Sequence, residues 1–347
     1  MANELPINPF EVRSTNTGLL VDETGTGLML ISVNEFQQWW RSLESSFQSP
    51  IGRKLIYAAS DDEEYFLATN PSYKIPKWFG KKKIVQAMGL RWTSMGWGLH
   101  FPDTRRIQSP CHDSLSTGIG LAHHEHVEQQ RYRMEWRQIN SDLIEMDFTN
   151  RAEDIPTAPP APSPEWASPV DLTDIHTHPI EHEFEPRSFG FFWGQQRSIF
   201  LPISILHRLF DSIIGRPFNS EQHCREGIQV TGISEQSSLL FLTLVESSAA
   251  MFQSSDYSIF LQNQGDWESH IQHNVISRGC GRVIVDDFSL EDGPSSCMTV
   301  HSPLPTFTVG LLVSMWERAH GSPCICDVEI TPNSLKIHLR PRSVEYI

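Results

Sequence analysis

The chain has 347 residues, of which 39% are hydrophobic and 20% are charged, with a formal net charge of −15 and a sequence pI of about 5.4. This apolar content excludes a globally disordered chain, and the length favours two domains. A surface this acidic repels phosphate backbones and anionic lipid, so we expect no nucleic acid or membrane surface as a partner.

The N-terminal residues 1–16 lack the basic start and the apolar stretch of a secretory signal. The longest apolar runs, such as 239–245, are far shorter than the roughly 20 residues of a membrane-spanning helix. The six cysteines are sparse and show no disulfide-scaffold spacing, which favours reduced thiols. We therefore expect a cytoplasmic protein with no membrane span.

The first predicted helix presents large apolar side chains at the spacing i, i+3, i+4, i+7, which places them on one buried face. These side chains are Phe36, Trp39, Trp40 and Leu43. The same spacing recurs 170 positions later, at Leu206, Leu209, Phe210 and Ile213. The two sets predict equivalent helices in the two halves of the chain.

Further matches follow in the same order at growing separations. Gly96 and Gly279 each open a glycine turn before a strand and are 183 positions apart. Gly118 and Gly310 each lie in a helix after a Ser-Pro step and are 192 positions apart. Each half then closes with two strand-like runs around a polar turn. Because the separation only increases, we interpret the halves as copies of one duplicated unit with insertions in the second.

Residues 151–188 separate the two halves. They hold eight of the 23 prolines, and acidic residues outnumber basic ones there by eight to two. Proline fixes φ and removes a backbone donor, so neither a helix nor a central strand is expected to run through this segment. We interpret 151–188 as an acidic linker between a first domain at 17–150 and a second domain at 189–347.

The end of the second half carries a family resemblance. It reads Cys297-Met-Thr-Val-His301-Ser-Pro, continues with a helix that contains Gly310, and ends with a strand that begins Cys324-Ile-Cys326. This pattern resembles the 4-vinyl reductase domain, a family related to subunits of TRAPP-type vesicle-tethering complexes. In that family a glycine-containing helix is followed by a cysteine-bearing strand, a turn and a terminal strand. The resemblance covers about the last 60 residues well and extends to the first half through the inferred duplication.

The resemblance implies an α/β fold of the α+β type, with two related domains that are each an antiparallel sheet covered by helices. It also implies a cavity for a small apolar ligand between the layers. Copies of this domain commonly pair, so the tandem chain is expected to form an intramolecular pseudo-dimer.

Some sensing members of that family hold a structural zinc, and Cys297 and Cys326 match two of its ligand positions. The other two positions fall on Pro323 and Ser334. Neither residue supplies the thiolate, imidazole or carboxylate that zinc prefers. We therefore expect no cofactor, and Cys297 and Cys326 are the candidate metal ligands if zinc is bound.

Two tryptophans are candidates to line the expected cavity. Trp92 and Trp97 flank the glycine turn that precedes a strand of the first half. Tryptophan buries a large apolar area and more often fills a core, so core packing is the alternative for both.

Two histidines are further candidates for the cavity. His123 and His124 lie on the predicted helix of the first half. The duplication places them opposite Met315 and Trp316, which belong to the apolar stripe of the second helix. At least one of the two histidines is therefore expected to face the core or a ligand cavity, and Met315 and Trp316 are the matching ligand-binding candidates in the second half. A solvated or hydrogen-bonded histidine is the alternative.

Histidine clusters also leave an enzymatic function open. His176 and His178 form a His-x-His pair in the linker, and His123 and His126 share a helix face. No P-loop, nucleophile elbow or dinucleotide fingerprint occurs, and we name no catalytic residue. We expect a non-enzymatic small-molecule-binding or scaffold protein, with a small apolar ligand or another protein as partner. The alternatives are a metal-dependent enzyme that uses the histidine clusters and a protein-interaction subunit without a ligand.

Overall fold

The computed structural model describes residues 12–76, 80–151, 156, 159–168, 176–180, 182–219, 225–291 and 293–342. Helices alternate with three largely antiparallel sheets, which confirms the predicted α+β class. Cys224 and Trp78 lie outside the described residues. In the described part of the chain, no helix is both long and apolar enough to cross a membrane.

The first half contains β1 (Arg13–Thr15), β2 (Leu20–Val21), β3 (Gly27–Ser32), α1 (Val33–Ser45), α2 (Gly52–Thr69), η1 (Pro71–Tyr73), α3 (Lys81–Ser94), β4 (Leu99–Phe101), η2 (Pro102–Thr104), β5 (Arg106–Gln108), α4 (Asp113–Glu128), β6 (Tyr132–Asn140) and β7 (Leu143–Asn150).

The remaining elements are β8 (Thr177–Pro179), β9 (Phe184–Arg187), β10 (Gly190–Trp193), β11 (Gln196–Pro202), α5 (Ile203–Ile213), β12 (Ile228–Thr231), α6 (Glu235–Gln253), α7 (Gln264–Asn274), η4 (Ile276–Arg278), β13 (Arg282–Ser289), β14 (Ser295–His301), α8 (Pro305–His320), β15 (Cys324–Ile330) and β16 (Leu335–Pro341). Apart from β8, β12 and the short 3-10 turns, they repeat the order of the first half: three strands, three helices, two strands, a helix and two strands.

A central sheet joins the two halves, in the strand order β8-β1-β2-β3-β11-β10-β9. Its middle pair is antiparallel, and Leu30 of β3 lies opposite Phe200 of β11. These two residues are 170 positions apart, which is the separation of the two matched helices that follow them. This register is the one expected for an approximate two-fold axis that passes between Leu30 and Phe200 and relates the halves.

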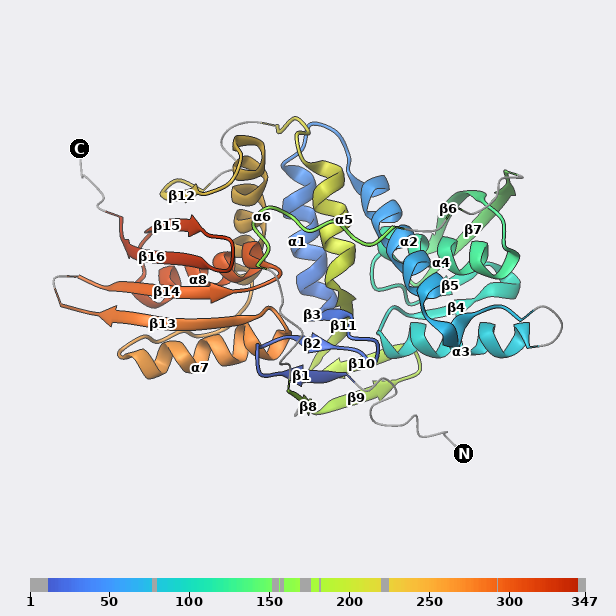
Figure 1. Cartoon of the computed structure of the whole chain (residues 1–347), viewed down its shortest axis with the longest axis horizontal. Helices are drawn as coiled ribbons and strands as arrows, with labels where there is room; N and C mark the ends of the chain where they lie inside the picture. Colours follow the sequence, from blue (N-terminus) through green and yellow to red (C-terminus); the bar gives the residue numbers. More distant parts are fainter. Residues whose placement is uncertain are drawn as a thin grey trace.

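The helices that follow the central sheet pack against helices of the other half. Helix α1 packs against α6, and α2 packs against α5. Figure 1 shows α1 and α5 at the centre, between an outer lobe that holds β12 to β16 and another that holds β4 to β7. On α1, the Trp39 ring lies 5.0 Å from the Phe307 ring of α8, measured between centroids. One hydrophobic cluster includes buried residues of both halves, so the halves share a continuous core.

A buried ion pair also links the halves. Ser32 begins α1 as the N-cap of a capping box with Glu35. The Glu35 carboxylate accepts hydrogen bonds at 2.8 Å from both terminal nitrogens of Arg278, which lies in η4 of the second half. Burial raises the pKa of Glu35, but Arg278 and the Ser32 amide outweigh that effect and lower it below the usual value.

Part of the segment interpreted as a linker belongs to the fold. Strand β8 pairs with β1, and β9 pairs with β10, so residues within 151–188 form both edges of the central sheet. Trp166 is buried, with its ring centroid 6.3 Å from that of Phe210 and 6.0 Å from that of Phe241. The described part of this segment contains no helix or central strand, but it is more than a hydrated linker: it supplies two edge strands, where proline is tolerated, and a buried tryptophan.

Candidate functional site

The first half contains a cavity of about 750 Å³ between α3, α4 and strands β4, β6 and β7. Its walls are mainly rings and aliphatic side chains. Residues that line it include His100, His123, His124, Tyr132, Phe148 and Met88, and we call it the histidine pocket. Cavities of this size accommodate small organic ligands.

The rings of the histidine pocket are held by one another. His124 on α4 stacks on Phe148 of β7, with a centroid distance of 3.9 Å and an interplanar angle of 8°. The Tyr132 ring meets His124 edge-on at 4.5 Å. On the other side, His100 stacks on the buried Trp92 at 4.7 Å. These contacts fix the ring planes before any molecule binds.

A buried charged cluster lies behind the pocket. Glu63 on α2, Arg91 on α3 and His123 on α4 are each no more than 2% exposed. Arg91 Nε donates to Glu63 Oε1 at 3.1 Å, and the guanidinium carbon lies 3.6 Å from the centre of the Phe66 ring. His123 Nε2 lies 2.9 Å from the same carboxylate oxygen. We call these three residues the charged triad, after the ion pair between Glu63 and Arg91.

The charged triad fixes the orientation of His123. Burial alone raises the pKa of Glu63, but the Arg91 guanidinium and His123 outweigh it and hold the pKa at about 2. Glu63 is therefore a carboxylate that only accepts hydrogen bonds, and His123 Nε2 must be the donor. This bond sets the tautomer of the imidazole ring.

The remaining pocket histidines are electrically neutral at neutral pH. Burial, together with the neighbouring His123 and His124, lowers the pKa of His100 to about 3. Burial also lowers the pKa of His124. His124 Nε2 is buried and has no hydrogen-bond partner among the residues that the structure describes. A bound molecule with a donor or acceptor at its edge would supply that partner.

The structure places Trp92 and Trp97 behind the pocket rather than on its wall. Both are fully buried, and their rings meet edge-on at 6.0 Å. Trp97 Nε1 donates to the Phe200 carbonyl of β11 at 3.1 Å, across the two halves. Of the predicted ligand-binding residues, only His123 and His124 line this pocket directly.

Met315 and Trp316 are packed in the core of the second half, each with an exposed fraction of 0%. Asn274 Nδ2 lies 3.8 Å from Met315 Sδ, and the Trp316 ring lies 4.3 Å from His320. The structure thus brings His123 and His124 into one pocket, whereas Met315 and Trp316 are packed in the core that the two halves share.

Two helix glycines show which buried residues of the two halves correspond. Gly118 approaches the Ile56 carbonyl of α2, and Gly310 approaches the Val245 carbonyl of α6, so those helices match at a separation of 189 positions. By this match Glu63 corresponds to Phe252. The glycine turns, 183 positions apart, match Arg91 with Asn274, and the helices α4 and α8 match His123 with Met315. The charged triad therefore has a largely apolar counterpart.

The predicted metal ligands are not brought together. Along β14 and β15, side chains alternate between the two faces of the sheet. Cys326 is fully buried on the face covered by helices, whereas Cys297 is partly exposed and lies in the same row as His338 and Asp327 on the other face. Among the described residues, no group of three or more His, Cys, Asp or Glu is arranged to hold a metal ion.

The two predicted histidine pairs, His123 with His126 and His176 with His178, are not brought together to face a common point either. His126 Nε2 bonds to the Tyr73 carbonyl at 2.8 Å, whereas His123 bonds to Glu63. His178 lies on β8 opposite Ser14, at the edge of the central sheet, and His176 is exposed beside it. Neither pair converges on a common point in the described structure.

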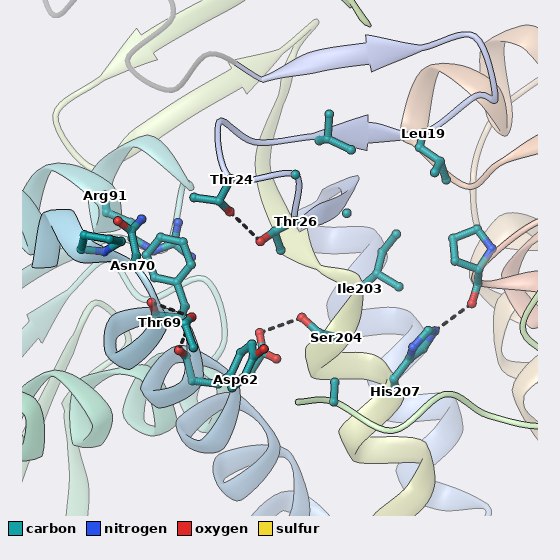
Figure 2. A pocket seen from close by; sticks show the side chains of 18 residues that line it. Leu19, Thr24, Thr26, Asp62, Thr69, Asn70, Arg91, Ile203, Ser204 and His207 are labelled. Carbon is teal, nitrogen blue, oxygen red and sulfur yellow. Dashed lines mark hydrogen bonds between the residues drawn. The ribbon is translucent and has the colours of Figure 1, made fainter. Parts of the chain in front are cut away.

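A second cavity of about 570 Å³ lies where α2 of the first half meets α5 of the second. Figure 2 shows Asp62 and Ser204 facing each other there; Ser204 Oγ donates to Asp62 Oδ2 at 2.9 Å. Arg208 Nε donates to the other oxygen at 3.1 Å. Burial nevertheless raises the pKa of Asp62 to about 6. His207 donates to the Pro303 carbonyl, so many polar groups here already bond to protein.

Sequence reasoning missed Asp62, Glu63 and Arg91. A signal was present: four consecutive acids, 61–64, lie within one helix. Because a helix turns through 100° per residue, four consecutive positions must reach round to its buried face. Three of the four, Asp62, Glu63 and Glu64, are in fact buried.

Comparisons of this chain with protein-family models, curated proteins and solved structures found no match. The chemistry of the site therefore rests on its geometry. Neutral, fixed rings around a cavity favour stacking and a single hydrogen bond, which are the interactions that hold flat organic molecules.

Proposed function

We propose that this chain is a non-enzymatic binding protein that takes a small, flat, uncharged molecule in the histidine pocket. The observation that carries the proposal is the ring-lined cavity with a buried, unpartnered His124 Nε2 on its wall. At the mouth, Lys81 and Arg105 are balanced by Asp103 and Glu128, which favours a ligand without net charge.

The titration behaviour of the pocket supports binding rather than proton transfer. A general acid or base works best when its pKa lies near the working pH. The pKa of His100 is about 3, so this ring is a poor proton donor at neutral pH. His123 already donates to Glu63, which leaves its ring as a wall of the pocket.

We also propose a distant relation to the 4-vinyl reductase domain. Two features are consistent with it: a cavity between helices and an antiparallel sheet, and two similar halves paired about the Leu30–Phe200 axis. The pairing supports the proposal of an intramolecular pseudo-dimer.

The test is native mass spectrometry of the full-length protein with a pocket-filling variant. Gly89 lies on α3, lines the histidine pocket, and has no atom within 4 Å of the place where a Cβ would stand. Gly89→Leu therefore fills the pocket without displacing the wall. The matched control is Gln272→Leu, at the exposed equivalent position on α7.

We expect the wild type and Gln272→Leu to carry a bound small molecule, or to bind added indole as a neutral ring probe. Gly89→Leu is expected to carry none and to bind indole at least roughly tenfold more weakly. If wild type and Gly89→Leu bind alike, or if the wild type binds neither a copurifying molecule nor indole, the proposal is wrong.

A further inference from the structure

The two outer sheets end differently. In the second half, β12 pairs in parallel with β15 and closes that edge of the sheet. In the first half, the equivalent strand β6 is the edge, and no strand in the described parts of the chain pairs with its outer side. Figure 1 shows β12 beside β15 in one lobe and β6 at the rim of the other. An unpaired edge presents free backbone donors and acceptors.

The filled edge shows what an occupant must offer. Ile228 lies opposite Cys326 and Val230 lies opposite Val328, while Gln229 and Thr231 alternate with them and are exposed. The apolar pair thus faces α6 and the core. Under this cover, Cys326 is 0% and Val328 2% exposed.

The open edge of β6 lies beside a groove, at the place that corresponds to β12 in the second half. The residues 192 positions before Cys326 and Val328 are Met134 and Trp136 of β6. Both line a groove of about 830 Å³ between α2 and β6, together with Tyr57 of α2. Trp136 is 36% exposed and Tyr57 54% exposed, so apolar surface that β12 covers in the second half meets solvent in the first.

The charges along the groove favour an acidic occupant. Arg53 and Arg151 line it, and neither forms an ion pair with a residue that the structure describes. Arg131, by contrast, is satisfied by Glu64 and Glu125, and Arg133 pairs with Glu135. The remaining acid of the lining is Asp61, so Arg53 and Arg151 leave the groove with a positive balance. A second copy of this chain would bring its own net charge of −15 against the first, so long-range repulsion disfavours self-association.

We propose that this groove docks an extended segment of a partner protein, which adds to β6 as a parallel strand. The segment carries aliphatic residues at alternate positions, to lie beside Met134 and Trp136, and acidic residues that meet Arg53 and Arg151. Backbone pairing supplies affinity and the alternate side chains supply selectivity. This docking site shares Tyr132 with the wall of the histidine pocket, but its other lining residues are different, and docking does not depend on a ligand in that pocket.

The test uses a fluorescein-labelled synthetic peptide that copies residues 226–233, Glu-Gly-Ile-Gln-Val-Thr-Gly-Ile, with two aspartates added at each end. Its binding to the full chain is followed by fluorescence anisotropy. The variants are Trp136→Lys and Tyr57→Lys in the groove. The control is Phe260→Lys, at a side chain that is 72% exposed in the second half. Thermal melting verifies that all variants fold.

We expect saturable binding by the wild type and Phe260→Lys, and at least roughly tenfold weaker binding by each groove variant. Arg53→Glu is expected to weaken binding most at low salt, because its effect is electrostatic. Absence of saturable binding by the wild type, or equal binding by the groove variants, overturns the proposal. A wild-type dimer in sedimentation that Trp136→Lys dissociates also overturns it, because a second copy then occupies the groove.

Discussion

The two halves of this chain have the same framework and different interiors. In the first half, Glu63, Arg91 and His123 form a buried charged triad behind an open pocket. In the second half, the matching positions hold Phe252, Asn274 and Met315, which are packed in the shared core. The two halves therefore differ in polarity at three matched positions on three helices.

The difference has a physical cost that suggests a use. Burying an ion pair removes two charges from water, and hydrophobic replacements are often at least as stable. The second half makes that replacement at Phe252. We infer that the first half retains the charges because they hold His123 in one tautomer at the wall of the pocket.

The largest expected effect is a difference in the free energy of unfolding between matched variants of the two halves. Arg91→Met removes the guanidinium from the buried Glu63 carboxylate and leaves it only the hydrogen bond from His123, so the free energy of unfolding should fall by about 3–5 kcal/mol. Asn274→Leu, at the matched position, removes weaker bonds and should cost less than about 1.5 kcal/mol. Urea denaturation of both variants measures the difference, and equal losses would show that the triad is not special.

The next effect is a dependence on pH. The pKa of His100 is about 3 in the folded chain and near 6.5 when unfolded. With respect to His100, the folded chain is most stable above pH 6.5. Its free energy of unfolding falls as the pH drops towards 3, because the unfolded state then binds a proton at His100 and the folded state does not. Between pH 7 and 5, the wild type should lose about 2 kcal/mol relative to His100→Phe. An equal change in the free energy of unfolding of the two proteins between pH 7 and pH 5 would contradict this.

A transplant of the second interior into the first sharpens the comparison. The triple variant Glu63→Phe, Arg91→Asn and His123→Met leaves no unpaired charge behind. It should lie within about 2 kcal/mol of the wild type, and so recover much of what Arg91→Met loses. Urea denaturation measures this recovery. A triple variant less stable than Arg91→Met alone would mean that the two interiors are not interchangeable.

The smallest effect concerns Gly89. Replacing a helix-interior glycine with leucine, where a side chain enters open space, should raise the free energy of unfolding by about 0.5–1 kcal/mol. Gln272→Leu on α7 should change it by less than about 0.5 kcal/mol. Thermal denaturation compares the two, and destabilisation by Gly89→Leu would indicate that the pocket wall has no room.

Local patterns explain which features could be predicted from the sequence. The helix containing Phe36 and the helix containing Leu206 follow from a 3.6-residue period, and the pairing of Leu30 with Phe200 preserves the predicted separation of 170. The packing of α2 of the first half against α5 of the second depends on contacts between residues distant in the chain, such as Asp62 with Ser204, and no local period encodes such contacts.

The predicted sites were limited for similar reasons. His123 and His124 were named as candidates for the core or a cavity by comparing the halves, and both line the histidine pocket. Cys297 and Cys326 were matched by spacing alone, which does not reveal that their side chains project from opposite faces of one sheet. The groove beside β6 depends on the absence of a β12 counterpart, which appears only when strand pairing is known.

The most direct test of the difference between the halves is hydrogen–deuterium exchange of the full chain with and without saturating indole. Binding in the histidine pocket should slow exchange in α3 and α4, at 81–94 and 113–128, and leave α7 and α8 unchanged. Equal protection of both pairs of helices, or protection confined to α7 and α8, would contradict a site that belongs to the first half.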